Sequence, residues 1–249
     1  MHQIPTKRYG RNLFFFEEID STNACALTLA ETGAEEGTVV WADYQTAGRG
    51  RRGRVWVGDP GKNLSFSVVL RDLPWARWTF LPYYVSESVA GAVEKLTGLD
   101  VTAKWPNDLL VESRKFCGIL IEGNGQESNA FAVAGIGMNV NQTDFPDHLS
   151  HAATSLARAT GSTADRVSIY HAVLVTLERL LEEVRTNGDT AVLDAWKDRC
   201  TTIGQDVSVR YGDESFRGKA IGLSDDGGLI VETADGLRTV FAGDVTLAA

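Results

Sequence analysis

Residues 101–140 read VTAKWPNDLLVESRKFCGILIEGNGQESNAFAVAGIGMNV. Apolar runs rich in β-branched and aromatic residues predict four strands in this stretch, at 101–105, 109–112, 116–122 and 131–140. The polar residues between the first three runs are turn formers and are too few to build a helical crossover. Because parallel strands need a crossover of roughly a dozen residues or more, these strands are expected to pair antiparallel. The stretch therefore favours an antiparallel or mixed sheet over a doubly wound parallel one.

Strands and helices alternate in the residues that flank this stretch. Period-two and period-3.6 apolar patterns distinguish the two kinds of element. Strands are predicted at 13–18, 37–44 and 63–70, and helices at 24–30, 81–97, about 162–187 and about 190–200. Residues 1–203 are thus predicted to form an α+β domain, with helices packed on a mixed, mostly antiparallel sheet.

The texture of the sequence changes at Gly204. Short strands are predicted at 205–211, 216–223, 229–233 and 237–242, joined by turns rich in glycine and aspartate. An all-β unit of this size lies near the lower limit for an independent core. We therefore expect residues 204–249 to form a small C-terminal SH3-like β-barrel that leans on the larger domain.

Composition excludes several classes of protein. The chain has 249 residues, 43% hydrophobic and 23% charged, which is typical of a soluble globular protein. The net charge of −9 disfavours non-specific binding to nucleic acid or to anionic membranes. No window approaches the ~20 apolar residues that a bilayer requires, and the apolar run at 13–16 is too short for a signal peptide. A cytoplasmic protein is expected.

The three cysteines give no metal or disulfide pattern. Cys25, Cys117 and Cys200 lie far apart and form no C-x-x-C pair. A zinc site or a disulfide framework is therefore disfavoured. We expect three buried thiols in a reducing compartment.

A basic, glycine-rich segment follows the predicted strand at 37–44. Residues 48–54 read GRGRRGR, which formally contains the dinucleotide-binding pattern G-x-G-x-x-G. That pattern requires a helix to begin inside the loop, and the sequence GDPG at 58–61 prevents a helix of useful length. The Walker pattern fails as well, because Arg54 and Val55 stand where Lys and Ser or Thr are required. Neither standard nucleotide-binding loop fits.

The four arginines of this segment call for a negative partner. Self-repulsion and glycine content both oppose an ordered loop. A polyanion such as a triphosphate would order it through charge-assisted, bidentate guanidinium contacts. A solvated basic loop is an equally weighted alternative on this segment alone. An Arg-Gly nucleic-acid patch is a further one, which the net negative charge disfavours.

Three other segments carry polar residues at special positions. Lys115 begins an apolar strand, where a lysine is either functional or simply extends its charged end to solvent. Gly135 and Gly137 within a strand indicate the close approach of a ligand or of another backbone, or a plain bulge. Asn139 could hydrogen-bond the edge of a planar heterocycle. The run Ser21-Thr22-Asn23 is either an ordinary helix N-cap or a clamp for a urea-like group.

Taken together, five segments resemble the biotin protein ligases. They are DSTN at 20–23, QTAGRGRRGR at 45–54, KWPND at 104–108, Lys115 with GIL at 118–120, and GIGMNVN at 135–141. They occur in that family's order and at similar spacings, and the resemblance runs from about residue 13 to the C-terminus. The arginine loop and the KWPND motif together are highly specific to the family.

The resemblance implies a role for each matching residue. Lys115, Arg51 and Asp108 are expected to be catalytic. Biotin-binding residues are expected to be Ser21, Thr22, Asn23, Gln45, Arg49, Gly50, Arg51, Lys115 and Gly118. ATP-binding residues are expected to be Arg49, Arg52, Arg54, Trp56, Asn107 and Asn139. Mg²⁺ is expected to be held mainly through the phosphates, and the resemblance names no protein ligand for it.

The resemblance also implies an activity for residues 1–203 as a biotin- and ATP-binding catalytic domain. It implies that biotin is activated with ATP to biotinyl-5′-AMP and transferred to a lysine of a biotin carboxyl carrier domain of a carboxylase. A lipoate or octanoate ligase or transferase of the same fold is the alternative enzyme. About a dozen residues precede the first strand, too few for a helix-turn-helix module, so we expect a monofunctional ligase without operator binding. Exposed sheet edges could also support a homodimer.

Overall fold

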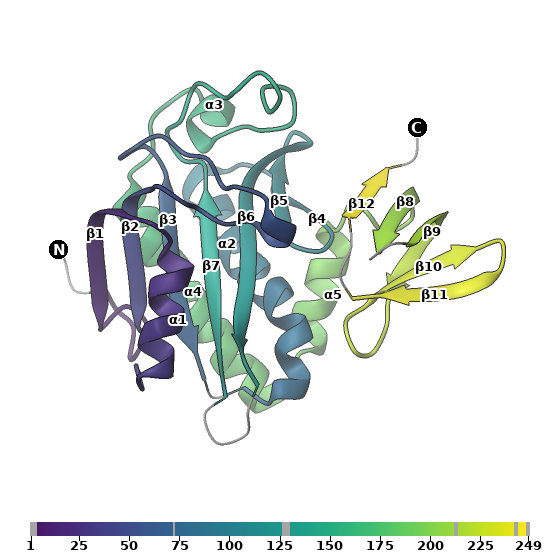
Figure 1. The fold of residues 1–249 in the computed structure, drawn as a ribbon, viewed down its shortest axis with the longest axis horizontal. Coiled ribbons are helices and arrows are strands. Elements are labelled where there is room, and N and C mark those ends of the chain that lie inside the picture. The colour runs from purple at the N-terminus through teal and green to yellow at the C-terminus, as the bar shows by residue number, and fades with distance from the viewer. Residues whose placement is uncertain (1–3, 72, 126–129, 212–213, 242–243, 248–249) are drawn as a thin grey trace.

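The computed structural model describes residues 4–71, 73–125, 130–211, 214–241 and 244–247. They form two sheets that lie side by side, a larger N-terminal one flanked by helices and a smaller C-terminal one (Figure 1). The larger sheet has seven strands in the order β1-β2-β3-β7-β6-β5-β4. These strands are β1 (Leu13–Ile19), β2 (Val39–Gln45), β3 (Leu64–Leu70), β4 (Thr102–Lys104), β5 (Asp108–Val111), β6 (Arg114–Asn124) and β7 (Phe131–Met138).

The pairing of these strands confirms a mixed, mostly antiparallel sheet. Every neighbouring pair is antiparallel except β1 and β2, which run parallel. The parallel pair is possible because the helix α1 (Thr22–Glu31) provides the crossover between its strands. The consecutive strands β4, β5 and β6 pair as hairpins, as the short connections predict.

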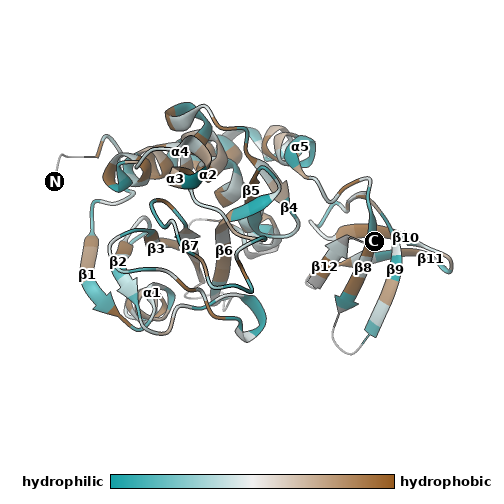
Figure 2. Ribbon diagram, turned by 90° about the horizontal axis from the view of Figure 1, so that it is seen from above, coloured by the Kyte–Doolittle hydropathy of each residue, from teal (hydrophilic) through white to brown (hydrophobic). Residues whose placement is uncertain are grey.

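Helices cover both faces of the larger sheet (Figure 2). α1 packs on one face, where its Ala26 and Ala30 meet Val40 and Val69. The opposite face carries the main core, with α2 (Leu81–Thr97), α4 (Arg166–Asn187) and α5 (Thr190–Arg199). Burial on both faces explains why every residue of β3 is buried.

Two short helical elements outside the basic, glycine-rich segment were not predicted. The helix α3 (Leu156–Thr160) begins at Ser155, whose side chain accepts a hydrogen bond from the backbone N–H of Arg158. A 3₁₀ helix at Trp75–Phe80 leads into α2. Elements of one or two turns carry too few residues to show a periodic pattern.

The smaller sheet is antiparallel throughout. Its strands are β8 (Asp206–Tyr211), β9 (Glu214–Leu223), β10 (Leu229–Thr233), β11 (Gly236–Val240) and β12 (Asp244–Leu247), in the order β11-β10-β9-β8-β12. The four predicted strands are present, and β12 is an additional one. The ladders among the described residues leave β11 and β12 at the two edges, so they close no barrel. The sheet contacts the larger domain where the Tyr83 hydroxyl donates to the carbonyl of Gly227 at 2.6 Å.

The remaining expectations for the chain as a whole have mixed outcomes. All three cysteines are free; Cys117 and Cys200 are buried, and Cys25 is half-buried. Burial raises the pKa of the Cys117 thiol far above its ordinary value. Within the described residues, no helix is long and apolar enough to cross a bilayer. The division of the chain between residues 203 and 204 stays a prediction.

Candidate active site

A cavity of about 440 Å³ opens beside the larger sheet. Its wall is built from the start of α1, the end of β2, the glycine–arginine segment, and strands β5, β6 and β7. The structure brings every sequence-predicted site residue to this one cavity. Its lining includes Ser21, Thr22, Asn23, Gln45, Arg49, Gly50, Arg51, Arg52, Arg54, Trp56, Asn107, Asp108, Lys115, Gly118 and Asn139.

The first turn of α1 forms one end of the cavity. Ser21 is the N-cap of the helix, and its side chain accepts from the backbone N–H of Ala24. The backbone N–H and the hydroxyl of Thr22 both donate to Gln45 Oε1, at 2.8 and 3.1 Å. The capping role considered for these residues is therefore present, and the same residues also line the cavity.

Asn23 spans the gap between α1 and the sheet. Its Nδ2 donates to Glu122 Oε2 at 2.8 Å, and its Oδ1 accepts from the Ser67 hydroxyl at 2.6 Å. The side chain lies directly on Gly135, where a Cβ atom would collide with the Asn23 amide. The close approach predicted at Gly135 is thus made by a side chain of the protein itself.

The indole ring of Trp56 lies across β6 and β7. A Cβ atom at Gly137 would lie 2.5 Å from the ring, and one at Gly118 would lie 3.2 Å from it. The ammonium group of Lys115 is 5.5 Å from the centre of the ring, within the range of a cation–π interaction. The indole Nε1 is buried and has no hydrogen-bond partner among the described residues.

The glycine–arginine segment forms a compact loop rather than a helix. Its backbone closes with hydrogen bonds from Gly50 N to Arg54 O at 2.7 Å and from Trp56 N to Gly48 O at 2.9 Å. The single turn of 3₁₀ helix at Arg51–Gly53 confirms that no helix of useful length begins here. The loop departs from standard nucleotide-binding loops as the sequence predicts.

Three arginines of the loop bond to different parts of the protein. Arg49 forms an ion pair with Glu122 at 3.0 Å. Arg51 donates to Asn107 Oδ1 at 3.3 Å, and Arg52 donates to the carbonyl of Arg210 in the smaller sheet at 3.2 Å. Burial lowers the pKa of the Arg51 guanidinium, and the nearby Asp108 carboxylate opposes that shift. The loop therefore touches both sheets.

The β5–β6 hairpin places a lysine and an aspartate together. Glu112 and Ser113, with φ of 50° and 61°, form its tight turn, as hairpins with a right-handed twist require. Lys115 follows the turn, and its Nζ lies 2.6 Å from Asp108 Oδ1. Lys115 therefore extends to a carboxylate in the cavity wall.

Asn139 ties the next segment of chain to the cavity. Its Nδ2 donates to the carbonyl of Thr154 at 3.0 Å, and its buried Oδ1 has no partner among the described residues. This oxygen is suited to accept a hydrogen bond from the exocyclic amine of an adenine, because a buried acceptor without a partner costs free energy.

Sequence reasoning missed part of the wall. Phe145, Leu149, Ala152 and Ala153 line the cavity from the segment between β7 and α3. The one available signal was a pair of large apolar residues within an otherwise polar, aperiodic stretch. Glu122, which bonds to two lining residues, was missed as well, because it reads as an ordinary polar position of a strand.

The described residues offer little to a metal ion directly. Among them, no three histidine, cysteine, aspartate or glutamate side chains gather to form a metal-binding group. Asp108 is the one carboxylate of the described cavity lining, and it is paired with Lys115. These residues fit a Mg²⁺ ion only if phosphate oxygens supply most of its ligands.

Family models match most of the chain. Residues 15–139 match the biotin/lipoate A/B protein ligase family, and residues 202–247 match the biotin protein ligase C-terminal domain. A "Bifunctional ligase/repressor BirA" of Bacillus spizizenii is 37% identical, over 98% of this chain and 76% of the relative. This chain belongs to the biotin/lipoate A/B protein ligase family. The resemblance carried by the five motifs is thereby confirmed.

Other members of the family match over nearly their full length. A "Biotin--[acetyl-CoA-carboxylase] ligase" of Paracoccus denitrificans is 34% identical, over 91% of this chain and 96% of the relative. The solved structure "Biotin protein ligase from Aquifex aeolicus in complex with biotin and ATP" superposes with a TM-score of 0.82 and 31% identity. That superposition covers 96% of this chain and 99% of the other. The fold is therefore that of the ligase family in both sheets.

Proposed function

We propose that the protein is an ATP-dependent biotin protein ligase. It activates biotin to biotinyl-5′-AMP and then transfers biotin to a lysine of a biotin carboxyl carrier domain. The observation that carries this proposal is the gathering of all fifteen sequence-predicted site residues in the lining of one cavity. The biotin ligase of Paracoccus and the Aquifex structure with biotin and ATP support these two ligands, and they favour biotin over lipoate as the acid.

The first step joins two anions. A carboxylate oxygen of biotin attacks the α-phosphorus of ATP, a P–O bond forms, and pyrophosphate leaves with the electron pair of the broken bond. Lys115 and Arg51 lie in the cavity wall as cations that offset the repulsion between the carboxylate and the phosphate. Holding both substrates in one cavity supplies a further share of the rate through orientation.

The intermediate is a mixed anhydride that water would destroy. We assign its protection to the loop of residues 48–62. Val55 and Val57 are 71% and 46% exposed in the protein without ligand, on a loop that lines the cavity. Ordering of this loop over the ligands would remove these apolar side chains from water and shield the adenylate.

The second step is attack by the lysine amine of the acceptor on the carbonyl carbon of the adenylate. An amide bond forms, the bond between the carbonyl carbon and the phosphate oxygen breaks, AMP leaves with that electron pair, and the proton of the amine passes to solvent water. Asp108 is the one carboxylate of the described cavity lining, and we assign to it the orientation of the incoming lysine amine. A Mg²⁺ ion bound to the phosphates would supply additional charge neutralisation in the first step.

We further propose that residues 1–203 and 204–249 are the two domains of the ligase.

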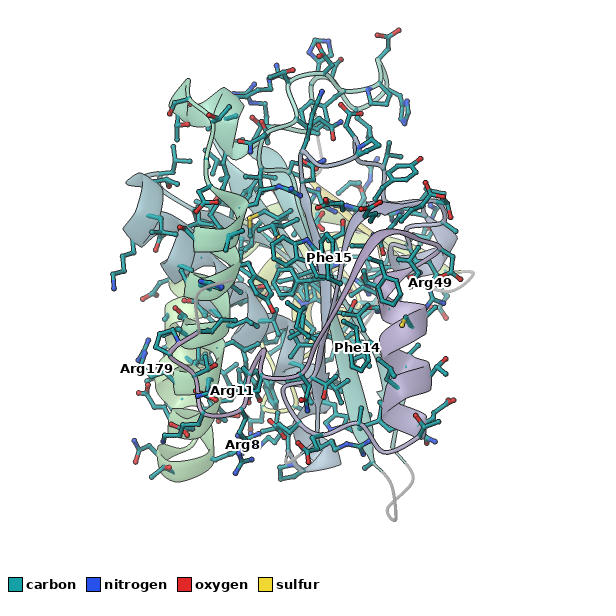
Figure 3. The ribbon with its side chains drawn as sticks, turned by 90° about the vertical axis from the view of Figure 1, so that its left-hand side faces the viewer. Arg8, Arg11, Phe14, Phe15, Arg49 and Arg179 are labelled. Atoms are coloured by element: carbon teal, nitrogen blue, oxygen red, sulfur yellow. The ribbon has the colours of Figure 1, made fainter. Side chains whose placement is uncertain are left out.

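A homodimer stays an expectation. β1 is an edge strand of the larger sheet, and Phe14 and Phe15 are exposed along it (Figure 3). Such an edge is where a second copy could pair.

Transfer of biotin to a carrier domain tests the proposal. The purified protein, biotin, ATP and Mg²⁺ are incubated with an isolated biotin carboxyl carrier domain, and the product is detected by its mass increase. We expect one biotin per carrier domain, and none when the acceptor lysine is replaced by arginine. Modification by lipoate under the same conditions, without modification by biotin, would contradict the assignment.

A further inference from the structure

Glu122 connects two parts of the cavity wall. It lies on β6, opposite Val133 of β7, outside the five motifs that carry the resemblance to the family. One carboxylate oxygen, Oε2, accepts from Asn23 Nδ2 at 2.8 Å and from Arg49 at 3.0 Å. A single anion therefore joins the first turn of α1 to the first arginine of the loop.

On the α1 side, Glu122 heads a chain of hydrogen bonds. The Asn23 amide donates to Glu122 through Nδ2 and accepts from the Ser67 hydroxyl through Oδ1. The Ser67 hydroxyl also lies 2.8 Å from Thr22 Oγ1. Thr22 in turn donates to Gln45 Oε1. All four residues beyond Glu122 lie at the end of the cavity that we assign to biotin, and three of them line it.

The charge of Glu122 fixes the direction of this chain. A carboxylate is an acceptor only, so it requires the NH₂ end of the Asn23 amide. The carbonyl end of that amide must then face Ser67, directly above Gly135. An amide at position 122 could present either end, and Asn23 could then turn over. The donors and acceptors offered to a bound ring would change with it.

On the loop side, Glu122 holds Arg49 by a weak contact. The two side chains are 31% and 43% exposed, so the pair is screened by solvent and salt. Arg51 and Arg52 bond elsewhere, to Asn107 and to the smaller sheet. Glu122 thus keeps the start of the loop close to α1 without preventing the loop from moving.

We propose that Glu122 is a positioning residue for biotin, which orients the Asn23–Ser67–Thr22–Gln45 chain and tethers the loop through Arg49. This inference rests on the proposed function, since it names the part of the same cavity that recognises the vitamin. Glu122 acts through its two partners and makes no contact with the reacting atoms.

The variant Glu122→Gln tests the proposal, because it keeps the size of the side chain and removes its charge. Calorimetry with biotin alone is expected to show binding weakened about tenfold, the loss typical of one hydrogen bond to a charged group. The Kd for ATP and the kcat of adenylate formation at saturating biotin are expected to stay within about twofold. If Glu122 had a purely structural role, the variant would lower the melting temperature and would not weaken biotin binding more than ATP binding.

Glu182→Gln is the matched control. Glu182 forms a similar exposed ion pair with Lys7 at 3.1 Å, far along α4 and away from the described cavity lining. Its removal is expected to leave both affinities unchanged. Should Glu122→Gln fail to fold, Glu122→Asp replaces it, since aspartate keeps the charge but withdraws it by one methylene from both partners.

A second variant separates the two arms of the contact. In the double variant Glu122→Gln/Arg49→Gln, the loss of biotin affinity is expected to be smaller than the product of the losses in the two single variants. The reason is that each single change already removes the same ion pair between the two side chains. Fully multiplicative effects, or biotin affinity unchanged in Glu122→Gln, would overturn the proposal. Absence of biotin binding by the unaltered protein would instead overturn the proposed function, so the two failures are distinct.

Discussion

The ammonium group of Lys115 lies 2.6 Å from a carboxylate oxygen of Asp108 across the β5–β6 hairpin. Each side chain is about one-third exposed or less, and both line the cavity. The pair keeps a cation ready in the wall without leaving its charge unbalanced. An arriving phosphate or carboxylate can share Lys115 with Asp108, because an ammonium group has three donors.

Replacing Lys115 with alanine should therefore affect catalysis far more than folding. We expect adenylate formation from biotin and ATP to slow about 100-fold or more, as is typical when one preorganised donor to developing charge is removed. The free energy of unfolding should fall by no more than about 1 kcal/mol, since the pair is partly exposed. Single-turnover kinetics and urea denaturation measure the two effects.

Lys197→Ala is the control for this variant. Lys197 forms an exposed ion pair with Asp194 on α5 at 3.0 Å and is outside both the 48–62 loop and the described cavity lining. The rate of adenylate formation by this control variant should match that of the unaltered protein. Near-normal adenylate formation in Lys115→Ala would show that the catalytic assignment is wrong.

A methyl group at Gly137 should displace Trp56. A Cβ atom there would lie 2.5 Å from the indole ring, closer than two carbon atoms can approach, and the ring is rigid. We expect Gly137→Ala to raise the KM for ATP about tenfold, equivalent to ~1.4 kcal/mol, because Trp56 is an expected ATP contact. Steady-state kinetics with each substrate varied in turn measures the change.

Gly91→Ala is the matched control, because the added methyl group would touch no neighbouring atom. Gly91 lies inside α2, and a Cβ atom there meets nothing within 4 Å. This variant should keep both KM values and gain about 0.5–1 kcal/mol of stability, as alanine does in a helix. Unchanged KM values in Gly137→Ala as well would mean that the ring position has no bearing on substrate binding.

Asp165 should make the stability of α4 depend on pH. As the N-cap, its side chain accepts from the N–H groups of Val167 and Ser168 and from the Ser168 hydroxyl. These bonds lower the pKa of the Asp165 carboxyl below its ordinary value of 3.8. The contribution is therefore complete above that value and is lost as the pH falls through the lower pKa of the folded protein.

Two substitutions at this position test the assignment. Asp165→Ala should cost about 0.5–2 kcal/mol at neutral pH, the usual value of an N-cap, and the cost should shrink in acid. Asp165→Asn keeps an acceptor oxygen without a titrating charge, so most of the stability should remain. Denaturation of the three proteins between pH 7 and pH 2 measures both; a cost for Asp165→Ala that does not change with pH would contradict the account.

The loop of residues 48–62 should be protected by its ligands. Without them, a protease specific for arginine is expected to cut within 49–54, and biotin together with ATP should slow this cleavage. Arg179 on the exposed face of α4 is an internal reference whose cleavage should not change. Cleavage of the loop at the same rate in both conditions would remove the ordering step from the mechanism.

Much of the fold follows from local patterns. The period of the apolar residues predicts α2 at residues 81–97, where the structure has it. The short connections predict the hairpins of β4, β5 and β6. The parallel pairing of β1 with β2 was not evident, because one helix between two strands is compatible with either direction.

The candidate site is predictable only where motifs carry it. Trp56 and Asn139 could be chosen from the sequence, yet the seat of the indole on Gly137 depends on packing between distant strands. Glu122 reaches Asn23 across 99 positions of sequence, and no local pattern indicates such a bond. Phe145 enters the cavity wall because the chain folds back after β7, which is a tertiary property.

The most direct test of the account is the biotin-dependent exchange of labelled pyrophosphate into ATP by the purified protein. Exchange reports only the reversible first step, so it needs no acceptor domain. We predict rapid exchange with biotin, and none when biotin is omitted or replaced by lipoate or octanoate. Exchange with lipoate but not with biotin, or none with any acid, would contradict the assignment of this cavity to biotin activation.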